Sequence, residues 1–368
     1  MKHSAGVLVI GGGPAGLAAA IAARKKGFDV TVADGAKPPI DKACGEGLMP
    51  NTLDALGELG AAICPGDGQA FRGTRFINGT TSVEASFSGA SGVGVRRTVL
   101  HQKMVERAQE CGISLQWNSP VTALAEGGAI ICGKVVKAKW IIGADGIHSR
   151  VRRWSGLEAH APEEIRFAQR RHYRVKAWTD YMEVYWGNRM QAYVTPLGND
   201  ETCVALISRE PRMRLADAWR EFPELASNLR AANPSSAERG TVTATRRLEH
   251  VYKGNIALIG DASGSVDAIT GEGLGLGFQQ AIALADALET GQLENYQRAH
   301  RRLARRPYIM GRLLLLLDRF PSLRRRALRA LADDPELFAR LLAVHRGESS
   351  PKFLAAIGIR VGWQFLTA

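Results

Sequence analysis

Short apolar runs and a longer alanine-rich stretch alternate at the start of the chain. Val7–Ile10 and Asp29–Ala33 are β-branched runs, and Pro14–Lys26 between them is rich in alanine. A continuous apolar run predicts a strand buried in a parallel sheet, and a longer alanine-rich stretch predicts a helix. The order predicts a strand–helix–strand unit. The uncharged stretch Ala5–Ala23 could pass for a membrane segment, but its glycines and its proline favour the soluble interpretation.

The hydrophobic pattern changes twice further along the chain. Trp140–Ile142 and Ile256–Ile259 predict two more buried strands, and Leu276–Leu288 predicts a long apolar helix. Between residues 165 and 208, β-branched and aromatic residues are separated by short turn sequences, which predicts an antiparallel sheet. The predicted strands of this sheet are Phe167–Trp178, Tyr181–Trp186, Gln191–Thr195 and Thr202–Ser208.

A glycine motif joins the first predicted strand to the first predicted helix. Gly11, Gly13 and Gly16 form G-x-G-x-x-G, and Asp34 ends the next strand. These glycines permit the turn, the approach of a pyrophosphate and the packing of helix on strand. The helix start at Pro14-Ala15 adds a partial positive charge for phosphates, and the aspartate can accept hydrogen bonds from a ribose diol. The motif predicts FAD or NAD, since a carboxylate would repel the 2′-phosphate of NADP.

Two later strand–turn segments decide between these nucleotides. One is Gly143-Ala144-Asp145-Gly146, and the other is Gly260-Asp261-Ala262-Ser263-Gly264, which is followed by Thr270–Gly275. With these segments in this order, the sequence resembles the flavoproteins of the para-hydroxybenzoate hydroxylase fold over about residues 5–290. This superfamily includes aromatic monooxygenases and geranylgeranyl reductases. The resemblance implies that the nucleotide is FAD.

The resemblance also implies a set of FAD contacts. The aspartate matching Asp261 holds the ribityl chain, the next glycine-rich turn faces the pyrimidine edge of the flavin, and Arg97 at a helix start contacts FAD. A helix N-terminus there would stabilise negative charge on the reduced flavin. The predicted FAD-binding residues are Gly11, Gly13, Pro14, Ala15, Gly16, Asp34, Lys42, Cys44, Gly45, Arg97, Asp145, Asp261, Gly271, Gly273 and Leu274.

Two segments point to different branches of the superfamily. Lys42–Pro50 resembles the Lys-x-Cys-Gly segment of geranylgeranyl reductases, which lies along the flavin, whereas Gly275–Ala281 is closer to the hydroxylase pattern. The leading prediction is an NAD(P)H-dependent monooxygenase that hydroxylates a hydrophobic aromatic or polyketide-like molecule. The alternatives are a reductase of isoprenoid double bonds and an electron-transfer flavoprotein. Cys44 is interpreted as a small apolar residue beside the cofactor, and no catalytic residue is predicted.

The expected fold class is mixed α/β. Residues 1–160 and 245–290 are predicted to form a Rossmann-type FAD-binding domain. Residues 161–244 form an inserted antiparallel β-sheet substrate domain, with residues 70–95 as a candidate extension, and 291–368 form a helical C-terminal region. In the resembling fold the inserted sheet covers the flavin ring, so Tyr185 and Tyr193 are candidate pocket residues.

Positive charge is concentrated near the C-terminus. Residues 298–329 hold eleven arginines and a single acid, Asp318, which accounts for ten of the formal net charge of +12. The rest of the chain is nearly neutral, so no nucleic-acid partner is predicted. Leu313–Leu317 within this segment is too short to span a bilayer. The hypothesis is peripheral contact with an anionic membrane or an acidic protein; the alternative is that the leucines pack on the FAD-binding domain.

The cysteines and histidines show no ligand spacing. The five cysteines are Cys44, Cys64, Cys111, Cys132 and Cys203. None of them pairs in a redox or metal-binding motif, which predicts a cytoplasmic protein without a disulfide framework or a metal site. The eight histidines are interpreted as surface or packing residues.

Overall fold

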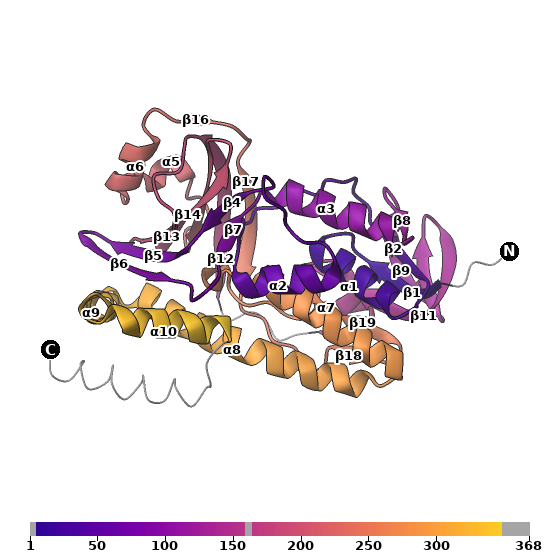
Figure 1. Cartoon of the computed structure of the whole chain (residues 1–368). Coiled ribbons are helices and arrows are strands. Elements are labelled where there is room, and N and C mark those ends of the chain that lie inside the picture. The colour runs from indigo at the N-terminus through magenta and orange to yellow at the C-terminus, as the bar shows by residue number, and fades with distance from the viewer. Residues whose placement is uncertain (1–4, 159–163, 348–368) are drawn as a thin grey trace.

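The structure, a computed structural model, describes residues 5–158 and 164–347. Two sheets of eight strands lie next to each other, and the C-terminal helices run beneath both of them (Figure 1). Parallel pairs dominate the first sheet and antiparallel pairs dominate the second. The predicted mixed α/β fold class is confirmed.

The first sheet is built around β1 (Ala5–Ile10), which pairs in parallel with β2 (Val30–Ala33) and β11 (Lys134–Gly143). Helices α1 (Pro14–Lys25) and α7 (Gly273–Thr290) pack on one face of this sheet. Because its parallel strands end at the same edge, the turns that follow them meet there. The other elements here are α2 (Pro50–Leu59), α3 (Arg97–Glu110), α4 (Arg150–Trp154), β8 (Ser114–Gln116), β9 (Val121–Ala125), β10 (Gly128–Ile131), β18 (Tyr252–Lys253) and β19 (Ile256–Leu258).

The second sheet is buried on both faces. Val184 and Tyr193 belong to the apolar cluster under the C-terminal helices, whereas Tyr185 and Val194 belong to the cluster under α5 (Leu215–Ala218) and α6 (Pro223–Leu229). Its strands run in the order β16 (Asn233–Pro234), β12 (Ile165–Arg174), β15 (Glu201–Ser208), β14 (Met190–Gly198), β13 (Met182–Trp186), β5 (Gly73–Asn78) and β6 (Thr81–Ser86), with β17 (Arg239–Ala244) beside β12. Strands β5 and β6 come from within residues 70–95. A small sheet of β3 (Gly47–Leu48), β7 (Gly92–Gly94) and β4 (Gln69–Phe71) lies next to it.

Most predicted elements agree with the structure to within a few residues. Helix α7 begins at Gly273, three residues before the predicted start, so its N-terminus reaches the glycine-rich turn. Strand β12 ends at Arg174 rather than at Trp178, and the Trp178 indole N–H donates to Glu183 Oε2, 3.0 Å away. Ala5–Ala23 forms β1, a turn and most of α1, and among the described helices none is long and apolar enough to cross a membrane.

Three helices complete the chain: α8 (Leu293–Arg319), α9 (Pro321–Asp333) and α10 (Pro335–Arg346). A proline at the first position of α9 and of α10 starts each of these helices anew. Helix α8 is attached to the FAD-binding region by Tyr296, whose hydroxyl donates to Leu258 O at 2.6 Å, and by His300, whose Nε2 lies 2.9 Å from Ser263 Oγ. The predicted apolar stretch Phe353–Ala368 lies outside the described residues.

The buried His300 makes stability depend on pH. Burial lowers its pKa to about 4, because desolvation disfavours the imidazolium form. An unfolded histidine has a pKa of about 6.5, so between these pH values the unfolded state binds the proton first, and stability falls as the pH falls. We expect about 2 kcal/mol less stability from this group at pH 5 than at pH 7.

Urea unfolding at both pH values measures this effect. His300→Gln should remove it, while His250→Gln, at an exposed histidine, should leave it in place. An unchanged pH dependence in the His300 variant would contradict the assignment.

Candidate functional site

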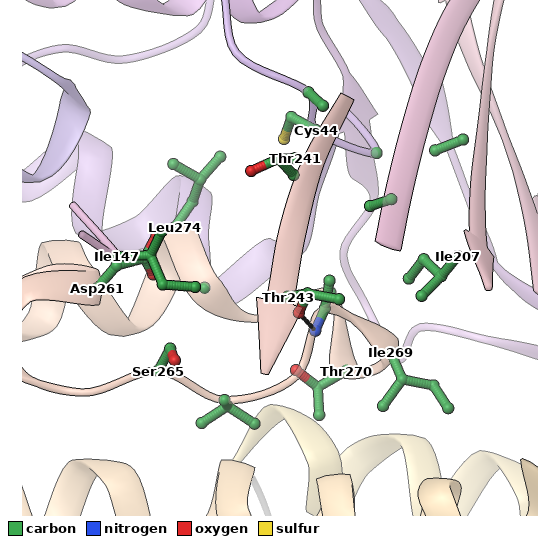
Figure 2. A pocket seen from close by; sticks show the side chains of 18 of the residues that line it. Cys44, Ile147, Ile207, Thr241, Thr243, Asp261, Ser265, Ile269, Thr270 and Leu274 are labelled. Carbon is green, nitrogen blue, oxygen red and sulfur yellow. Dashed lines mark hydrogen bonds between the residues drawn. The ribbon is translucent and has the colours of Figure 1, made fainter. Parts of the chain in front are cut away.

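One cavity of about 1260 Å³ connects the two sheets and the C-terminal helices. It starts at the glycine-rich turn after β1, passes the turn after β19 and continues between the second sheet and helices α8 to α10. Figure 2 shows Asp261 and Leu274 at one side of this space and Ile207 and Ile269 at the other, with Thr243 between them. The cavity therefore has a polar end at the first sheet and an apolar end at the second.

The glycine turn presents bare backbone to the polar end. Gly11 has a φ of +112°, which a side chain disfavours, and a Cβ on Gly16 would meet the carbonyl oxygen of Gly11 at 1.8 Å. A Cβ on Gly13 would meet no atom within 4 Å, because this residue faces the cavity. Asp34 also lines the cavity, and its carboxylate accepts hydrogen bonds from the backbone N–H groups of Gly12 at 2.6 Å and Ala36 at 2.7 Å.

Two helix N-termini face the same space. Neither α1 nor α7 has an acidic residue in its first turn or a side-chain cap. Pro14 and Ala15 of α1 and Gly273 and Leu274 of α7 line the cavity. Free N–H groups and the helix dipole therefore favour negative charge at both points.

Charged side chains border the polar end. The Arg97 side chain lines the cavity, and its buried Nε has no acceptor among the described residues. Lys42 Nζ lies 3.4 Å from Asp261 Oδ2, with both side chains about two-fifths exposed. Asp145 lines the cavity and also caps α4 by accepting from the Arg150 N–H at 2.6 Å. These groups can donate to, or accept from, a bound nucleotide.

The structure brings together all but two of the predicted site residues. Gly16 lies behind the turn, where it lets α1 pack on β1, as its predicted role requires. Tyr185 was predicted in the pocket, and this was wrong. Its hydroxyl donates to Glu183 Oε2 at 2.9 Å, and its ring packs edge-on against Phe222 on the opposite face of the sheet. Tyr193, from the next strand, lines the cavity.

A buried acid, Glu46, was missed by sequence reasoning although it lies in the Lys42–Pro50 segment. Its carboxylate accepts from the Arg97 backbone N–H at 3.0 Å and from His172 Nε2 at 2.7 Å. Arg170 approaches the same carboxylate and can only donate, so its 3.2 Å contact with His172 Nδ1 places the imidazole proton on Nε2. Glu46 thus ties the segment that carries Cys44 to α3 and to β12.

Cys203 lies within the same cluster, and Glu46, His172 and Cys203 are close enough together to bind a metal ion. The guanidinium of Arg170 faces this carboxylate and would repel a cation. Burial raises the pKa of the Cys203 thiol well above its ordinary value, which keeps the sulfur neutral. These contacts favour a hydrogen-bonded anchor over a metal centre. The side-chain partners of Glu46 in this anchor lie more than 120 residues away in the sequence, so only the folded structure shows the cluster.

A second titratable pair borders the cavity at the start of α7. His345 lines the cavity, and its Nε2 donates to the carbonyl oxygen of Thr270 at 3.1 Å, which leaves Nδ1 directed at Glu272 Oε2, 3.7 Å away. Both residues are more than nine-tenths buried, and neither of these two atoms has a hydrogen-bond partner among the described residues. Arg306 Nη2 lies 3.5 Å from the other carboxylate oxygen of Glu272, Oε1.

The far end of the cavity is apolar. Its walls come from β5, β13 and β15 on one side and from the three C-terminal helices on the other. The wall residues include Phe76, Val184, Ile207, Met310, Leu314, Leu331, Phe338 and Leu342. This end can hold a long hydrocarbon chain or a flat apolar molecule.

A cavity that offers backbone N–H groups to phosphates at one end and an apolar space at the other suits a flavin nucleotide and its substrate. The fold and the site therefore define an FAD-dependent oxidoreductase. The chain belongs to the FAD binding domain family, whose model matches residues 4–294. The predicted superfamily, the FAD cofactor and the enzyme class are confirmed.

Relatives of this chain carry several activities. It is 28% identical over 354 residues to the menaquinone reductase of Mycolicibacterium smegmatis, which covers 87% of each chain. It is also 28% identical over 297 residues to digeranylgeranylglycerophospholipid reductase 1 of Methanococcoides burtonii, covering 74% of this chain and 72% of that one. A flavoprotein/dehydrogenase from Cytophaga hutchinsonii has the same fold, with a TM-score of 0.81, 20% identity and coverage of 93% and 92%.

The open position at Gly13 yields a test of the nucleotide site. Gly13→Val should fold normally but bind FAD at least about a hundredfold more weakly, because its side chain would occupy the space that a pyrophosphate needs. Gly57→Val in α2 is the matched control, since a Cβ there also meets no atom within 4 Å and the residue is exposed. Fluorescence titration of the apoprotein with FAD measures both affinities. Equal affinities would contradict the placement of the pyrophosphate.

The anchor at Glu46 yields a second test. Glu46→Ala leaves the buried Nε2–H of His172 without its acceptor and removes a carboxylate from beside Arg170, which keeps its ion pair with Asp41. This change should cost about 3 kcal/mol of stability. The control Glu84→Ala removes a half-exposed partner of Arg75 and should cost less than about 1 kcal/mol. Urea unfolding of the apoproteins measures both losses. Similar small losses in the two variants would show that the cluster is not an anchor.

Proposed function

We propose that this protein reduces a carbon–carbon double bond in the isoprenoid chain of a lipid. The observation that carries the proposal is the long apolar end of the cavity, which continues from the flavin site to the three C-terminal helices. The chain is similar to two reductases, and this similarity supports the proposal. One of them is a menaquinone reductase, and the other is a reductase of a digeranylgeranyl lipid. The Lys42–Pro50 segment, which resembles that of geranylgeranyl reductases, agrees with the same choice.

The residues at the polar end are suited to hold FAD. The turn at Gly13 and the N-terminus of α1 would bind the pyrophosphate, Asp34 the ribose diol, and Asp261 and Arg97 the remaining polar groups. When it is reduced, bound FAD supplies a hydride to the substrate. The uncapped N-terminus of α7 lies at the same cavity and favours an anionic ring over a neutral one.

The apolar residues would bind and orient the lipid chain. Val184 and Ile207 from the sheet and Phe338 and Leu342 from α10 line opposite walls, so a hydrocarbon between them is shielded from water. Excluding water also protects the reduced cofactor from side reactions. Tyr193 keeps its proton, because its hydroxyl donates to Ile269 O at 3.0 Å and burial raises its pKa.

Saturating a double bond requires a proton in addition to the hydride. His345 is the group of the cavity wall that could supply one, because its Nδ1 has no hydrogen-bond partner among the described residues and faces Glu272 Oε2 at 3.7 Å. His345 also lines the cavity itself. We therefore assign His345 as the group that delivers the proton to the substrate carbon, with Glu272 holding its ring in position.

An anaerobic single-turnover experiment tests the proposal. The FAD of the full-length protein is photoreduced, a detergent-dissolved geranylgeranyl lipid is added, and the visible absorption of the flavin is followed. We expect flavin reoxidation without oxygen and a product that has gained two hydrogen atoms. His345→Gln should slow this reoxidation and change its pH profile, while Gly57→Val should not.

The competing outcome is the monooxygenase that leads the sequence predictions. In that case reduced flavin persists with every prenyl lipid until oxygen is admitted, and a hydroxylated aromatic or polyketide-like product forms. Reoxidation only by a protein acceptor would favour the electron-transfer alternative. Both results contradict the reductase proposal. NAD(P)H as the reductant stays a prediction, which steady-state reduction under nitrogen with each nicotinamide measures directly.

A further inference from the structure

The apolar end of the cavity opens at the surface beside α8. Ile309, Leu313 and Leu316 line the cavity and are nevertheless 38%, 45% and 45% exposed. Side chains that line the cavity and are also exposed to solvent lie where the cavity opens at the surface. We call this opening the mouth of the cavity. Single exposed apolar residues are ordinary, but here three of them share one helix and one opening, which marks an interaction site.

These residues belong to a longer stripe on the outer face of α8. Arg305, Ile309, Arg312, Leu313, Leu316, Arg319 and Phe320 are all exposed. Arg305, Ile309, Leu313, Leu316 and Phe320 follow one another at intervals of three or four residues, and Arg312 and Arg319 directly precede Leu313 and Phe320. The set therefore shares one face of the helix, and Phe320 at its end is 47% exposed. We call this set the α8 stripe. It combines four large apolar side chains with three arginines.

The arginines of the stripe are not neutralised by the protein. Within residues 5–158 and 164–347, no acidic side chain forms an ion pair with Arg305, Arg312 or Arg319. The nearby acid of α8, Asp318, points inward, where it accepts from Arg209 at 2.7 Å and from Gln191. Helix α9 adds three more exposed arginines, Arg325, Arg326 and Arg329. The surface around the mouth is therefore strongly positive.

We propose that the α8 stripe docks on an anionic lipid bilayer, so that the mouth of the cavity opens into the membrane. The apolar side chains would lie at the boundary of the acyl chains, with the arginines at the headgroups. An isoprenoid chain would then enter the cavity without crossing water. This inference rests on the proposed function for the identity of the substrate, but the docking itself does not depend on it.

Charge favours a membrane over a second copy of the chain. In a two-fold symmetric contact the stripe would face itself, and its arginines would approach like charges. An anionic bilayer has negatively charged headgroups that can pair with the arginines of the α8 stripe. The acyl chains directly beneath them can receive its leucine and phenylalanine side chains.

Vesicle flotation of the full-length, FAD-loaded protein tests the docking. The vesicles are phosphatidylcholine alone or phosphatidylcholine mixed with phosphatidylglycerol, at low and high salt. We expect binding to the anionic vesicles at low salt and weaker binding at high salt. Arg312→Gln with Arg319→Gln should weaken it about thirtyfold, at about 1 kcal/mol per arginine and about 1.4 kcal/mol per factor of ten.

Leu313→Gln with Leu316→Gln should weaken binding at least about tenfold. Two controls match these variants. Val135→Gln removes an apolar residue that is 54% exposed on the first sheet, and Arg212→Gln with Arg220→Gln removes exposed arginines from the segments before and after α5. Both controls should bind vesicles as the unaltered protein does.

Three results would overturn the docking proposal. The unaltered protein could stay unbound at low salt, which would fit residues 348–368 of the chain covering the stripe. The controls could lose as much binding as the stripe variants. Sedimentation could show a dimer that the leucine variants dissociate and that does not bind vesicles. Because turnover of the unaltered protein in detergent needs no membrane, a failed docking test and a failed reductase test are distinguishable.

Discussion

The buried carboxylate of Glu46 is the constraint on which the shape of the site depends. It receives hydrogen bonds from the start of α3 and from His172 of the second sheet, and Arg170 of the same strand lies beside it. One side chain thus holds three parts of the protein together: the segment with Cys44, helix α3 with Arg97, and strand β12 of the second sheet. Such a group is costly to bury, so its partners must stay in place. Gly45 and Arg97, which line the polar end of the cavity, belong to the segments that Glu46 joins.

The second sheet acts as a buried middle layer, and this explains how the fold encloses a cavity with a large apolar end. Helices cover both faces of β13 and β14, so alternate residues of a strand belong to different cores. Val184 and Tyr193 reach the cavity while Tyr185 stabilises the far side. The C-terminal helices are therefore walls of the site as well as packing elements. Their leucines line a space that the first sheet alone could not enclose.

Three parts of the site could be predicted from the sequence: the glycine turn, Asp34 and the turn at Asp261. Each is a local motif, because the spacing of its glycines and the neighbouring strand and helix are all visible within a short stretch of sequence. The error at Tyr185 had a physical cause, since alternation cannot identify the cavity face of a sheet that is buried on both sides. Glu46, His172 and His345 escaped prediction because their partners lie far away in the sequence. The sequence around an isolated histidine does not identify its hydrogen-bond partner when that partner lies far away in the chain.

The network around Asp318 shows why the charge of the C-terminal region faces outward. Asp318, the only acid among eleven arginines in residues 298–329, binds Arg209 and Gln191, and Gln191 in turn accepts from Arg166. Arg166 donates to Asp267 at 2.9 Å, beside the glycine-rich turn of the flavin site. The inner face of α8 is thus fixed to the second sheet by Asp318, and Arg305, Arg312 and Arg319 on the outer face form no ion pair with an acid among the described residues. The same interaction that positions the cavity wall therefore creates the positive surface around its mouth.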